Sequence, residues 1–330
     1  MIGVIGMVRG DILSNPYGQV IREKHNPGTL SMDFAGTGMN LCRNLRALGE
    51  DVRFFSVAGN DLPGRAAKME LECLGVDVRD MLLLSESNTS MSLEIRNIVD
   101  ELELSFGNFD VMEKMDEAYM HHRLDKINET DLLVCDGACS PDGWALLLEN
   151  RKDTPLIVDP QGVEENKIDP WDLKYIHTII PERREAEVIS GLRILSEDEL
   201  MEAGEWFIAH GVKRVFITLA GGGVYCREGE KAHVLRPDPV KIQSLKGAGD
   251  GFTSGVVFAQ QAGKDLIETA QWAMAVAEMT LEARGYVNEK LSKEELGRRK
   301  NEQDDEDGQG KAMSADNQKS GKAADVGVLL

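Results

Sequence analysis

A glycine-rich turn that opens a helix carries the clearest chemical signal in the sequence. Residues 245–252 read Leu-Lys-Gly-Ala-Gly-Asp-Gly-Phe, and an apolar helical pattern follows through Val256 and Ala259. Such a turn presents unpaired backbone N–H groups at the positive end of a helix dipole, which is an arrangement that binds phosphate. Asp250 stands in the first helical turn, where a carboxylate can remove a proton from a hydroxyl that attacks phosphorus. The alternative is that Asp250 only caps the helix.

A second glycine cluster follows the strand that we expect over 214–219. It reads Thr218-Leu-Ala-Gly-Gly-Gly-Val-Tyr, so Gly221 and Gly223 stand beyond the carboxyl end of that strand. Ligands of open α/β sheets bind at such ends, and the alternative is a glycine-rich hairpin turn. The sequence contains neither GxxxxGK[ST] nor GxGxxG, which disfavours P-loop and dinucleotide-binding folds.

A third cluster, Gly36-Thr-Gly38-Met-Asn40, opens the helix that we expect over 40–48. Small residues there let a ligand approach the backbone, and the Asn40 amide both donates and accepts hydrogen bonds. Asp11 follows the first apolar run, so we expect it to face the same cleft and to bind a sugar diol. A tight turn with an N-cap is the alternative for the glycine cluster, and turn formation is the alternative for Asp11.

The elements that must position these groups alternate between short apolar runs and longer helical patterns. This rhythm, with continuous apolar strands, is typical of an α/β fold with a mostly parallel sheet covered on both faces. We expect strands at 2–6, 52–57, 132–135, 156–158, 178–180 and 214–219. We expect helices at 40–48, 64–74, 117–129, 141–151, 182–190 and 196–210.

Two segments, residues 14–34 and 88–106, break this rhythm. They alternate polar and apolar residues, as in Ser92-Leu-Glu-Ile-Arg96, so each strand has one wet face and one buried face. We interpret them as a small β-sheet lid over the main sheet. A pair of surface hairpins without a function is the alternative.

The charge balance and the cysteines exclude several classes of protein. The chain has 330 residues, with 57 acidic against 37 basic side chains and a net charge of −20, so it repels nucleic acids and anionic membranes. Five cysteines without a CxxC pair indicate neither a disulfide scaffold nor a zinc knuckle. With no secretory signal pattern and no apolar run long enough to span a membrane, we expect a cytoplasmic protein.

The folded domain is expected to cover residues 1–297. From residue 298 the apolar periodicity stops, and the sequence becomes rich in Asn, Gln, Asp, Glu, Gly, Ser and Lys. Such a composition buries too little apolar surface to fold, so we expect residues 298–330 to be a disordered tail. Residues 300–330 contain seven acidic and four basic side chains, so most of the negative charge belongs to the domain.

Taken together, these motifs resemble the ribokinase-like (PfkB) carbohydrate and nucleoside kinases. The matching residues occur in order up to about residue 290: Asp11, Gly36-x-Gly38-x-Asn40, Gly59-x-Asp61-x-x-Gly64, Pro181-x-x-x-Glu185, Thr218-x-x-Gly221-x-Gly223 and Gly247-Ala-Gly-Asp250. The resemblance implies a ribokinase-like fold with a β-sheet lid. It also implies transfer of the ATP γ-phosphoryl group to an alcohol, with Mg²⁺ as cofactor.

The resemblance also implies a role for each matching residue. The catalytic group is Asp250 as general base, with the backbone N–H groups of Gly247, Ala248 and Gly249 as anion hole. The sugar is held by Asp11, Gly36, Gly38 and Asn40. The ATP site contains Thr218, Gly221, Gly223, Lys246, Gly247 and Gly249, with Ala273 and Ala277 beside the adenine. The metal is organised by Glu185 and by Glu182, which stands where the family usually has Asn.

Within this family, the sequence is similar to the kinases that phosphorylate the 5′-hydroxyl of pseudouridine. Stretches such as Asn26-Pro-Gly28, Val158-Asp-Pro160 and Ile176-His-Thr178 support this similarity, although most of them are scaffold positions. Ribose, a purine nucleoside or a keto-sugar acid are alternative acceptors, and a non-catalytic nucleoside-binding pseudokinase is an alternative of another class. Related kinases dimerise through the lid, so the resemblance implies a homodimer.

Overall fold

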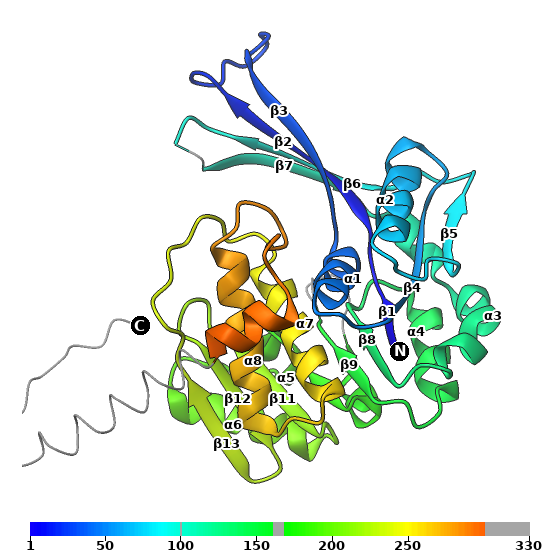
Figure 1. Ribbon diagram of the computed structural model, residues 1–330, viewed down its shortest axis with the longest axis vertical. Coiled ribbons are helices and arrows are strands. Elements are labelled where there is room, and N and C mark those ends of the chain that lie inside the picture. Colours follow the sequence, from blue (N-terminus) through cyan, green and yellow to red (C-terminus); the bar gives the residue numbers. More distant parts are fainter. Residues whose placement is uncertain (100, 161–167, 301–330) are drawn as a thin grey trace, which may run out of the picture.

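The computed structural model describes residues 1–99, 101–160 and 168–300, and within them a large sheet forms the centre of the fold (Figure 1). Its strands are β1 (Ile2–Ile5), β4 (Val52–Gly59), β5 (Met81–Leu84), β8 (Leu132–Cys135), β9 (Leu156–Val158), β10 (Thr178–Ile179), β11 (Arg214–Thr218), β12 (Val224–Glu228) and β13 (Lys231–Leu235). Their spatial order is β13-β12-β11-β10-β9-β8-β1-β4-β5. All neighbours pair in parallel except β11–β12 and β12–β13, which are antiparallel.

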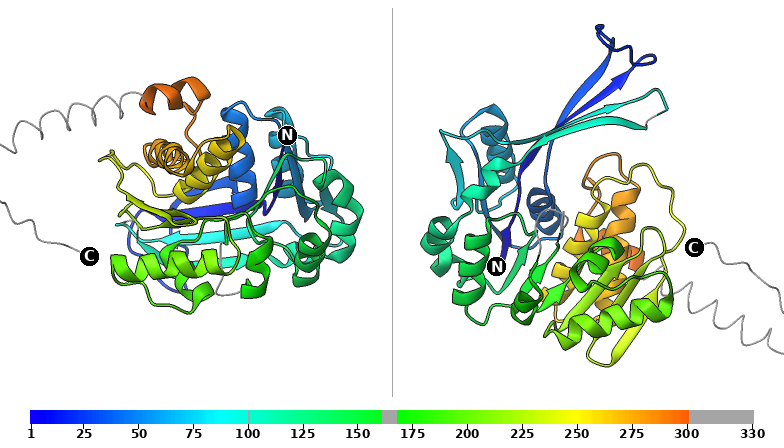
Figure 2. Two further views of the ribbon diagram at one scale, coloured as in Figure 1. Left: turned by 90° about the horizontal axis from the view of Figure 1, so that it is seen from below. Right: turned by 180° about the vertical axis from the view of Figure 1, so that it is seen from behind.

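Helices cover both faces of this sheet, as the sequence pattern predicts (Figure 2). They are α1 (Thr37–Ala47), α2 (Leu62–Cys73), α3 (Glu117–Ile127), α4 (Pro141–Asn150), α5 (Arg183–Ser190), α6 (Glu197–Ala209), α7 (Ala248–Gln261) and α8 (Leu266–Leu281). The other helical elements of the described residues are two 3₁₀ turns, η1 (Asp110–Lys114) and η2 (Pro170–Tyr175), and a helix over residues 293–300.

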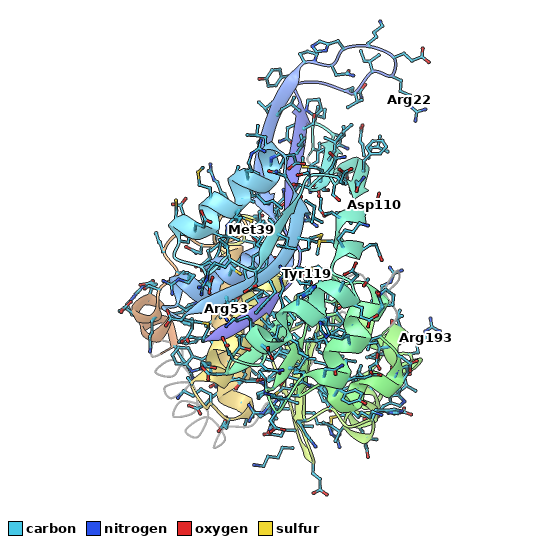
Figure 3. All side chains as sticks on the ribbon, turned by 90° about the vertical axis from the view of Figure 1, so that its right-hand side faces the viewer. Arg22, Met39, Arg53, Asp110, Tyr119 and Arg193 are labelled. Carbon is cyan, nitrogen blue, oxygen red and sulfur yellow. The ribbon has the colours of Figure 1, made fainter. Side chains whose placement is uncertain are left out.

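Two apolar cores result from the alternation of side chains along the strands. Ile2 and Val4 of β1 pack with α1, α2, α7 and α8, whereas Ile5 packs on the opposite face with α3, α4, α5 and α6. Met39 of α1 is fully buried in the first core (Figure 3). The helices that carry the glycine-rich motifs, α1 and α7, therefore share one face of the sheet.

A separate four-stranded sheet projects from this body as the expected lid (Figure 1). Its strands are β2 (Arg9–Pro16), β3 (Gly28–Ala35), β6 (Ser90–Arg96) and β7 (Leu102–Asn108), in the order β3-β2-β6-β7. The first lid segment begins at Arg9 rather than at residue 14, so Asp11 lies in a lid strand and not in a turn. Arg22 lies in the loop at the far tip of the lid (Figure 3).

The chain order defines a switch point in the main sheet. From β1 the chain proceeds to β4 and β5 on one side, and later to β8, β9, β10 and β11 on the other. Ligands of such sheets bind at the carboxyl ends of the strands where the order reverses, here between β1 and β8. The expected ligand site therefore lies where Gly6 and Asp136 follow these two strands.

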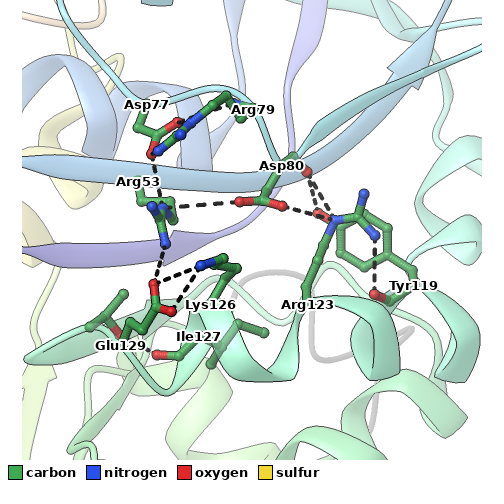
Figure 4. Close-up of polar contacts among 10 residues, drawn as sticks. Arg53, Asp77, Arg79, Asp80, Tyr119, Arg123, Lys126, Ile127 and Glu129 are labelled. Atoms are coloured by element: carbon green, nitrogen blue, oxygen red, sulfur yellow. Dashed lines mark hydrogen bonds and ion pairs between the residues drawn. The ribbon is translucent and has the colours of Figure 1, made fainter.

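A network of ion pairs ties the β4–β5 edge of the sheet to α3 (Figure 4). Arg53, near the start of β4, is 7% exposed and contacts Asp77 at 2.9 Å and Glu129 at 3.3 Å. Arg123 of α3 lies 3.6 Å from Asp80 in the same network. Arg53 is near the amino end of β4. The network therefore stabilises the end of the strands that lies away from the ligand site, which is at their carboxyl ends.

The described residues extend to residue 300, three residues into the segment that we expect to be the tail. Residues 293–300 are helical, Leu296 is fully buried, and Arg299 forms ion pairs with Glu278 at 3.3 Å and Glu282 at 2.8 Å. Residues 298–300 thus continue the fold, since Arg299 pairs with these glutamates and Lys300 Nζ donates to Gln271 Oε1 of α8 at 2.9 Å. Residues 301–330, the rest of the predicted tail, lie outside the described residues. Within the described part of the chain, no helix has the length and apolar character needed to cross a membrane.

Candidate active site

Asp250 lies in the first turn of α7, at the carboxyl edge of the main sheet. Gly247 precedes the helix with φ +73°, and a Cβ there would overlap the carbonyl oxygen of Tyr286, so only glycine fits. No side chain among the described residues caps this helix start, which leaves its first N–H groups for an anion. The helix therefore combines an anion-binding end with a carboxylate that is 7% exposed.

The Asn40 side chain reaches Asp250 directly. Its Nδ2 donates a hydrogen bond to Asp250 Oδ2 at 2.7 Å, and the Thr37 side chain also bonds the carboxylate. Burial raises the pKa of Asp250, whereas the bonds from Asn40 and Thr37 and the charge of Arg9 lower it. The N-terminus of α1 thus helps to keep a buried carboxylate ionised, as a general base requires.

Asp136 closes the switch point between β1 and β8. Its Oδ2 accepts the backbone N–H of Met7 at 2.7 Å and that of Gly38 at 3.1 Å, while Oδ1 accepts that of Ala138 at 2.9 Å. Burial, with a smaller contribution from the charge of Asp250, raises the pKa of Asp136 to about 6 against these three bonds. The carboxylate therefore anchors the α1 N-terminus to the end of the sheet.

Asp159, directly after β9, is a third buried carboxylate at this edge. Thr253 Oγ1 of α7 donates a hydrogen bond to Asp159 Oδ2 at 2.6 Å. Burial raises the pKa of Asp159, and the charges of Asp250, Glu185 and Asp136 raise it further, against the bond from Thr253. The charges of three other carboxyl groups therefore act on Asp159, and a cation beside Asp159 would offset their repulsion.

The lid contributes Asp11 to the other side of the site. Arg9 Nε donates to Asp11 Oδ1 at 2.7 Å, Arg9 Nη2 donates to Oδ2 at 3.2 Å, and the Tyr286 hydroxyl donates to Oδ2. Lys246 Nζ lies 5.3 Å from the centroid of the Tyr286 ring. Tyr286 thus joins the lid aspartate to the loop before α7.

The glycines of the α1 cluster serve packing as well as any ligand. Gly36 adopts φ +103°, and a Cβ at Gly36 or Gly38 would collide with the backbone of residues 6–8. Both glycines are buried, so they bring the α1 N-terminus against the end of β1. The structure brings Asn40 next to Asp250 through this close approach.

The second glycine cluster forms a hairpin turn between antiparallel β11 and β12. Leu219 N donates to Gly223 O at 2.9 Å, and Thr218 N donates to Pro181 O at 3.0 Å. Gly221 is exposed with φ +89° and open space around its Cα, whereas a Cβ at Gly223 would overlap the carbonyl oxygen of Leu235. The backbone here is therefore the glycine-rich hairpin turn that we gave as the alternative. Within this turn, Gly221 is the glycine that remains open to a ligand.

The two alanines expected beside adenine differ in their surroundings. Ala273 is fully buried in α8, where its Cα lies against Gly255 of α7. It is buried against α7 in this conformation, and its expected place beside the adenine stays a prediction. Ala277, one turn further along α8, is only partly buried and lies near Gly251.

The two glutamates expected at the metal begin α5. Glu185 Oε2 accepts the backbone N–H of Glu182 at 2.8 Å as part of a capping box, and Glu182 pairs with Thr218 through a backbone bridge. Among the described residues, no three His, Cys, Asp or Glu side chains form a metal cluster. Mg²⁺ requires only one or two carboxylates beside substrate phosphates and water, so Glu185 with Asp159 fits this ion.

Comparison with known proteins identifies the family to which this chain belongs. Residues 2–293 match the pfkB family of carbohydrate kinases. The chain belongs to this family. It is therefore a sugar or nucleoside kinase, a phosphotransferase with an alcohol group as acceptor.

Individual members of the pfkB family match along most of their length. Pseudouridine kinase of Escherichia coli (strain K12) is 25% identical over 291 residues, 88% of this chain and 93% of that enzyme. Guanosine-inosine kinase of Exiguobacterium acetylicum is 26% identical over 281 residues, 84% of this chain and 92% of that enzyme. The structure of Arabidopsis thaliana ribokinase with ribose and ATP matches with a TM-score of 0.83 at 18% identity, over 90% of this chain and 97% of that one. The ribokinase-like fold with its lid is thereby confirmed.

Several residues of this pfkB kinase site escape detection in the sequence. Asp136 and Asp159 each follow a short apolar strand, and a carboxylate at that place is a signal that could have found them. Tyr286 stands in a stretch without a pattern, and its contact with Asp11 spans 275 residues. Tertiary packing alone reveals its place.

Proposed function

We propose that this kinase transfers the γ-phosphoryl group of ATP to the 5′-hydroxyl of pseudouridine. The observation that carries the reaction is the 2.7 Å bond between Asn40, on the acceptor side, and Asp250, at the anion-binding end of α7. The proposal for the acceptor rests on the likeness to pseudouridine kinase along 88% of the chain. The solved relative that holds ribose and ATP supports both ligand types.

The proposed mechanism uses Asp250 as the base and the start of α7 as the anion hole. Asp250 accepts the proton of the 5′-hydroxyl as the oxygen bonds to the γ-phosphorus, and the bond from phosphorus to the ADP oxygen breaks. The N–H groups of Gly247, Ala248 and Gly249 stabilise the charge on the transferring group. Asp11, Gly36, Gly38 and Asn40 hold the sugar, so alignment supplies much of the catalysis.

The nucleotide and its metal are proposed to lie between the second glycine cluster and α7. Thr218, Gly221 and Lys246 contact ATP, with Gly223 shaping the turn and Ala277 beside the base. Bound Mg²⁺ would neutralise phosphate charge in this acidic site. Glu185 and Asp159 are proposed to hold it, with Glu182 at the rim, through water or directly.

A panel of acceptors tests this proposal. ADP release is measured with ATP, Mg²⁺ and pseudouridine, uridine, ribose, inosine, adenosine or a keto-sugar acid, and the products are identified by ³¹P NMR. We expect the highest kcat/KM with pseudouridine. A higher value with inosine would favour a purine nucleoside kinase, which the likeness to guanosine-inosine kinase makes the second candidate. No turnover, together with thermal stabilisation by a nucleoside, would favour the pseudokinase.

We also propose that the kinase is a homodimer through the lid. Strand pairing aligns Met32, Ile12, Leu93 and Phe106 in one row, on the lid face opposite Asp11. Met32 is 47% exposed and Phe106 56% exposed, so this face offers apolar surface to a second copy. Sedimentation velocity at micromolar concentration should give a dimer, and a Phe106→Asp variant should shift it to monomer. A monomer in the unmodified protein would reject the proposal.

A further inference from the structure

Arg43 links three elements around the base without contacting it. It stands on α1 one turn after Asn40, and only 16% of its side chain is exposed. Its Nη1 donates to the Phe34 carbonyl at the end of β3 at 2.7 Å and to Asn40 Oδ1 at 3.3 Å. Its Nε and Nη2 donate to Glu70 Oε1 of α2 at 2.9 and 2.5 Å. The lid, α1 and α2 therefore meet at one guanidinium.

The hydrogen-bonding chemistry of Arg43 determines how the Asn40 amide is oriented. A guanidinium only donates, so the amide oxygen of Asn40 must face Arg43, and the amide nitrogen is left to face Asp250. The reversed amide would point its NH₂ at the Arg43 donors and its oxygen at the Asp250 carboxylate. Both pairs would then be repulsive in a buried site, where Asn40 is 1% exposed.

We propose that Arg43 is a positioning residue that holds Asn40 as a donor to the base and ties this pair to lid strand β3. This inference rests on the proposed role of Asp250 as general base. Arg43 touches no reacting atom, so it acts through Asn40. A lid that moves β3 away would loosen the Phe34–Arg43 contact and thereby the donor to Asp250.

The pH dependence of turnover reports this role. Besides Asn40 and Thr37, the charged groups that act on Asp250 are Arg9 from β2, Asp136 after β8 and Asp159 after β9. A donated hydrogen bond favours the carboxylate, so its loss raises the pKa of Asp250. Because the base works only when ionised, the acid limb of the kcat profile must then move to higher pH.

A double-mutant cycle with a matched control tests the proposal. We compare Arg43→Met, Asn40→Ala and the double variant by kcat against pH, with Arg214→Met as control. Arg214 forms a similar ion pair with Glu228, at 2.8 Å with 15% and 41% side-chain exposure, against 16% and 37% for Arg43 and Glu70. It lies at the start of β11, away from the site.

We expect Arg43→Met to lower kcat about 10-fold, the effect of about 1.4 kcal/mol, and to move the acid limb upward. In the Asn40→Ala background the same change should alter kcat less than about 2-fold, because its target is gone. Arg214→Met should leave the profile unchanged. An equal loss in both backgrounds, or an equal shift in the Arg214 control, would overturn the proposal.

A second variant covers the case in which Arg43→Met fails to fold. Arg43→Lys keeps the charge and a contact with Glu70, but it lacks the planar fork that reaches Asn40 at the same time. We expect it to fold and to show the shifted acid limb, whereas a folded Arg43→Lys with the wild-type limb contradicts the proposal. If Asp250→Asn keeps turnover, the base assignment itself fails, which is a different result from an additive cycle.

Discussion

The carboxylate of Asp136 accepts the backbone N–H of Gly38 at 3.1 Å, and this bond fastens helix α1 to the switch point of the sheet. The same oxygen accepts the N–H of Met7, so it joins the ends of β1 and β8 to the helix that carries Asn40. The buried Asp136 carboxylate, which accepts three backbone N–H groups, thus fixes the helix from which Asn40 donates to Asp250.

The titration of Asp136 should appear in the stability of the protein. The pKa of Asp136 is raised to about 6 in the folded chain, above the ordinary value of about 4. A raised pKa contributes stability that is complete below the ordinary value and is lost as pH rises through the folded value. We expect the unfolding free energy of the wild type relative to Asp136→Asn to fall by about 3 kcal/mol between pH 4 and pH 7. Urea denaturation at several pH values measures this, and a constant difference would contradict it.

Asp250→Asn should separate chemistry from binding. The amide has the same shape and can still accept the bond from Asn40, so the fold and the ATP site should persist. The base is lost, and we expect kcat to fall by about 10³-fold while the Kd for ATP changes less than about 3-fold. Calorimetric titration with ATP supplies the binding control. A variant with near wild-type kcat would show that another group accepts the proton.

Tyr286→Phe should affect the acceptor rather than the nucleotide. The change removes only the hydroxyl that donates to Asp11 and leaves the ring beside Lys246. Because the hydroxyl holds Asp11 in place with Arg9, we expect the acceptor KM to rise about 10-fold, with the KM for ATP unchanged. Tyr175→Phe, at a partly exposed tyrosine of η2, is the matched control. A lower acceptor KM would mean that the hydroxyl competes with the sugar for Asp11.

The sequence predicts those elements whose formation depends on neighbouring residues alone. Strands such as β1 and β8, the alternating lid strands, and the glycine turns before α1 and α7 follow from hydrophobic period and backbone freedom. The edge strand β13 does not, because with exposed residues such as Lys231 and His233 it lacks a continuous apolar run.

The parts that sequence could not supply depend on which elements meet. Asp136 matters because β8 lies beside β1, and that order is a property of the whole sheet. Ala273 has the small side chain of a nucleotide-binding position, but α7 presents Gly255 to it and buries it. A sequence motif shows which residue type stands at a position. Whether that residue contacts a ligand or packs in the core depends on the element that lies against it in the fold.

The two turn glycines Gly221 and Gly223 should respond differently to alanine. Both have positive φ, which costs a non-glycine residue about 1 kcal/mol, but only Gly223 would also drive a Cβ into the Leu235 carbonyl. We expect Gly223→Ala to lower the unfolding free energy by about 3 kcal/mol or more, and Gly221→Ala by about 1 kcal/mol. Gly221→Ala should instead raise the KM for ATP. Equal losses of stability in urea denaturation would reject this division.

The Arg53 network should support stability without affecting catalysis. Arg53→Met removes the buried partner that Asp77 and Glu129 share, while Asp77 keeps Arg79 and Glu129 keeps Lys126, so the unfolding free energy should fall by about 1.5–3 kcal/mol. Arg79 also pairs with Asp77 but is 78% exposed, so Arg79→Met should change stability little. Hydrogen bonds from Arg79 and Arg53 hold the pKa of Asp77 well below its ordinary value.

That lowered pKa gives the Arg53 prediction a pH signature. The stability contributed by Asp77 is complete above its ordinary pKa of about 4 and is lost as pH falls further, so the wild type should lose its advantage over Arg53→Met in acid. At neutral pH and moderate temperature kcat should stay within about 2-fold, because Arg53 lies at the opposite end of the strands from Asp250. A large fall in kcat in folded Arg53→Met would show that the β4–β5 edge is coupled to the site.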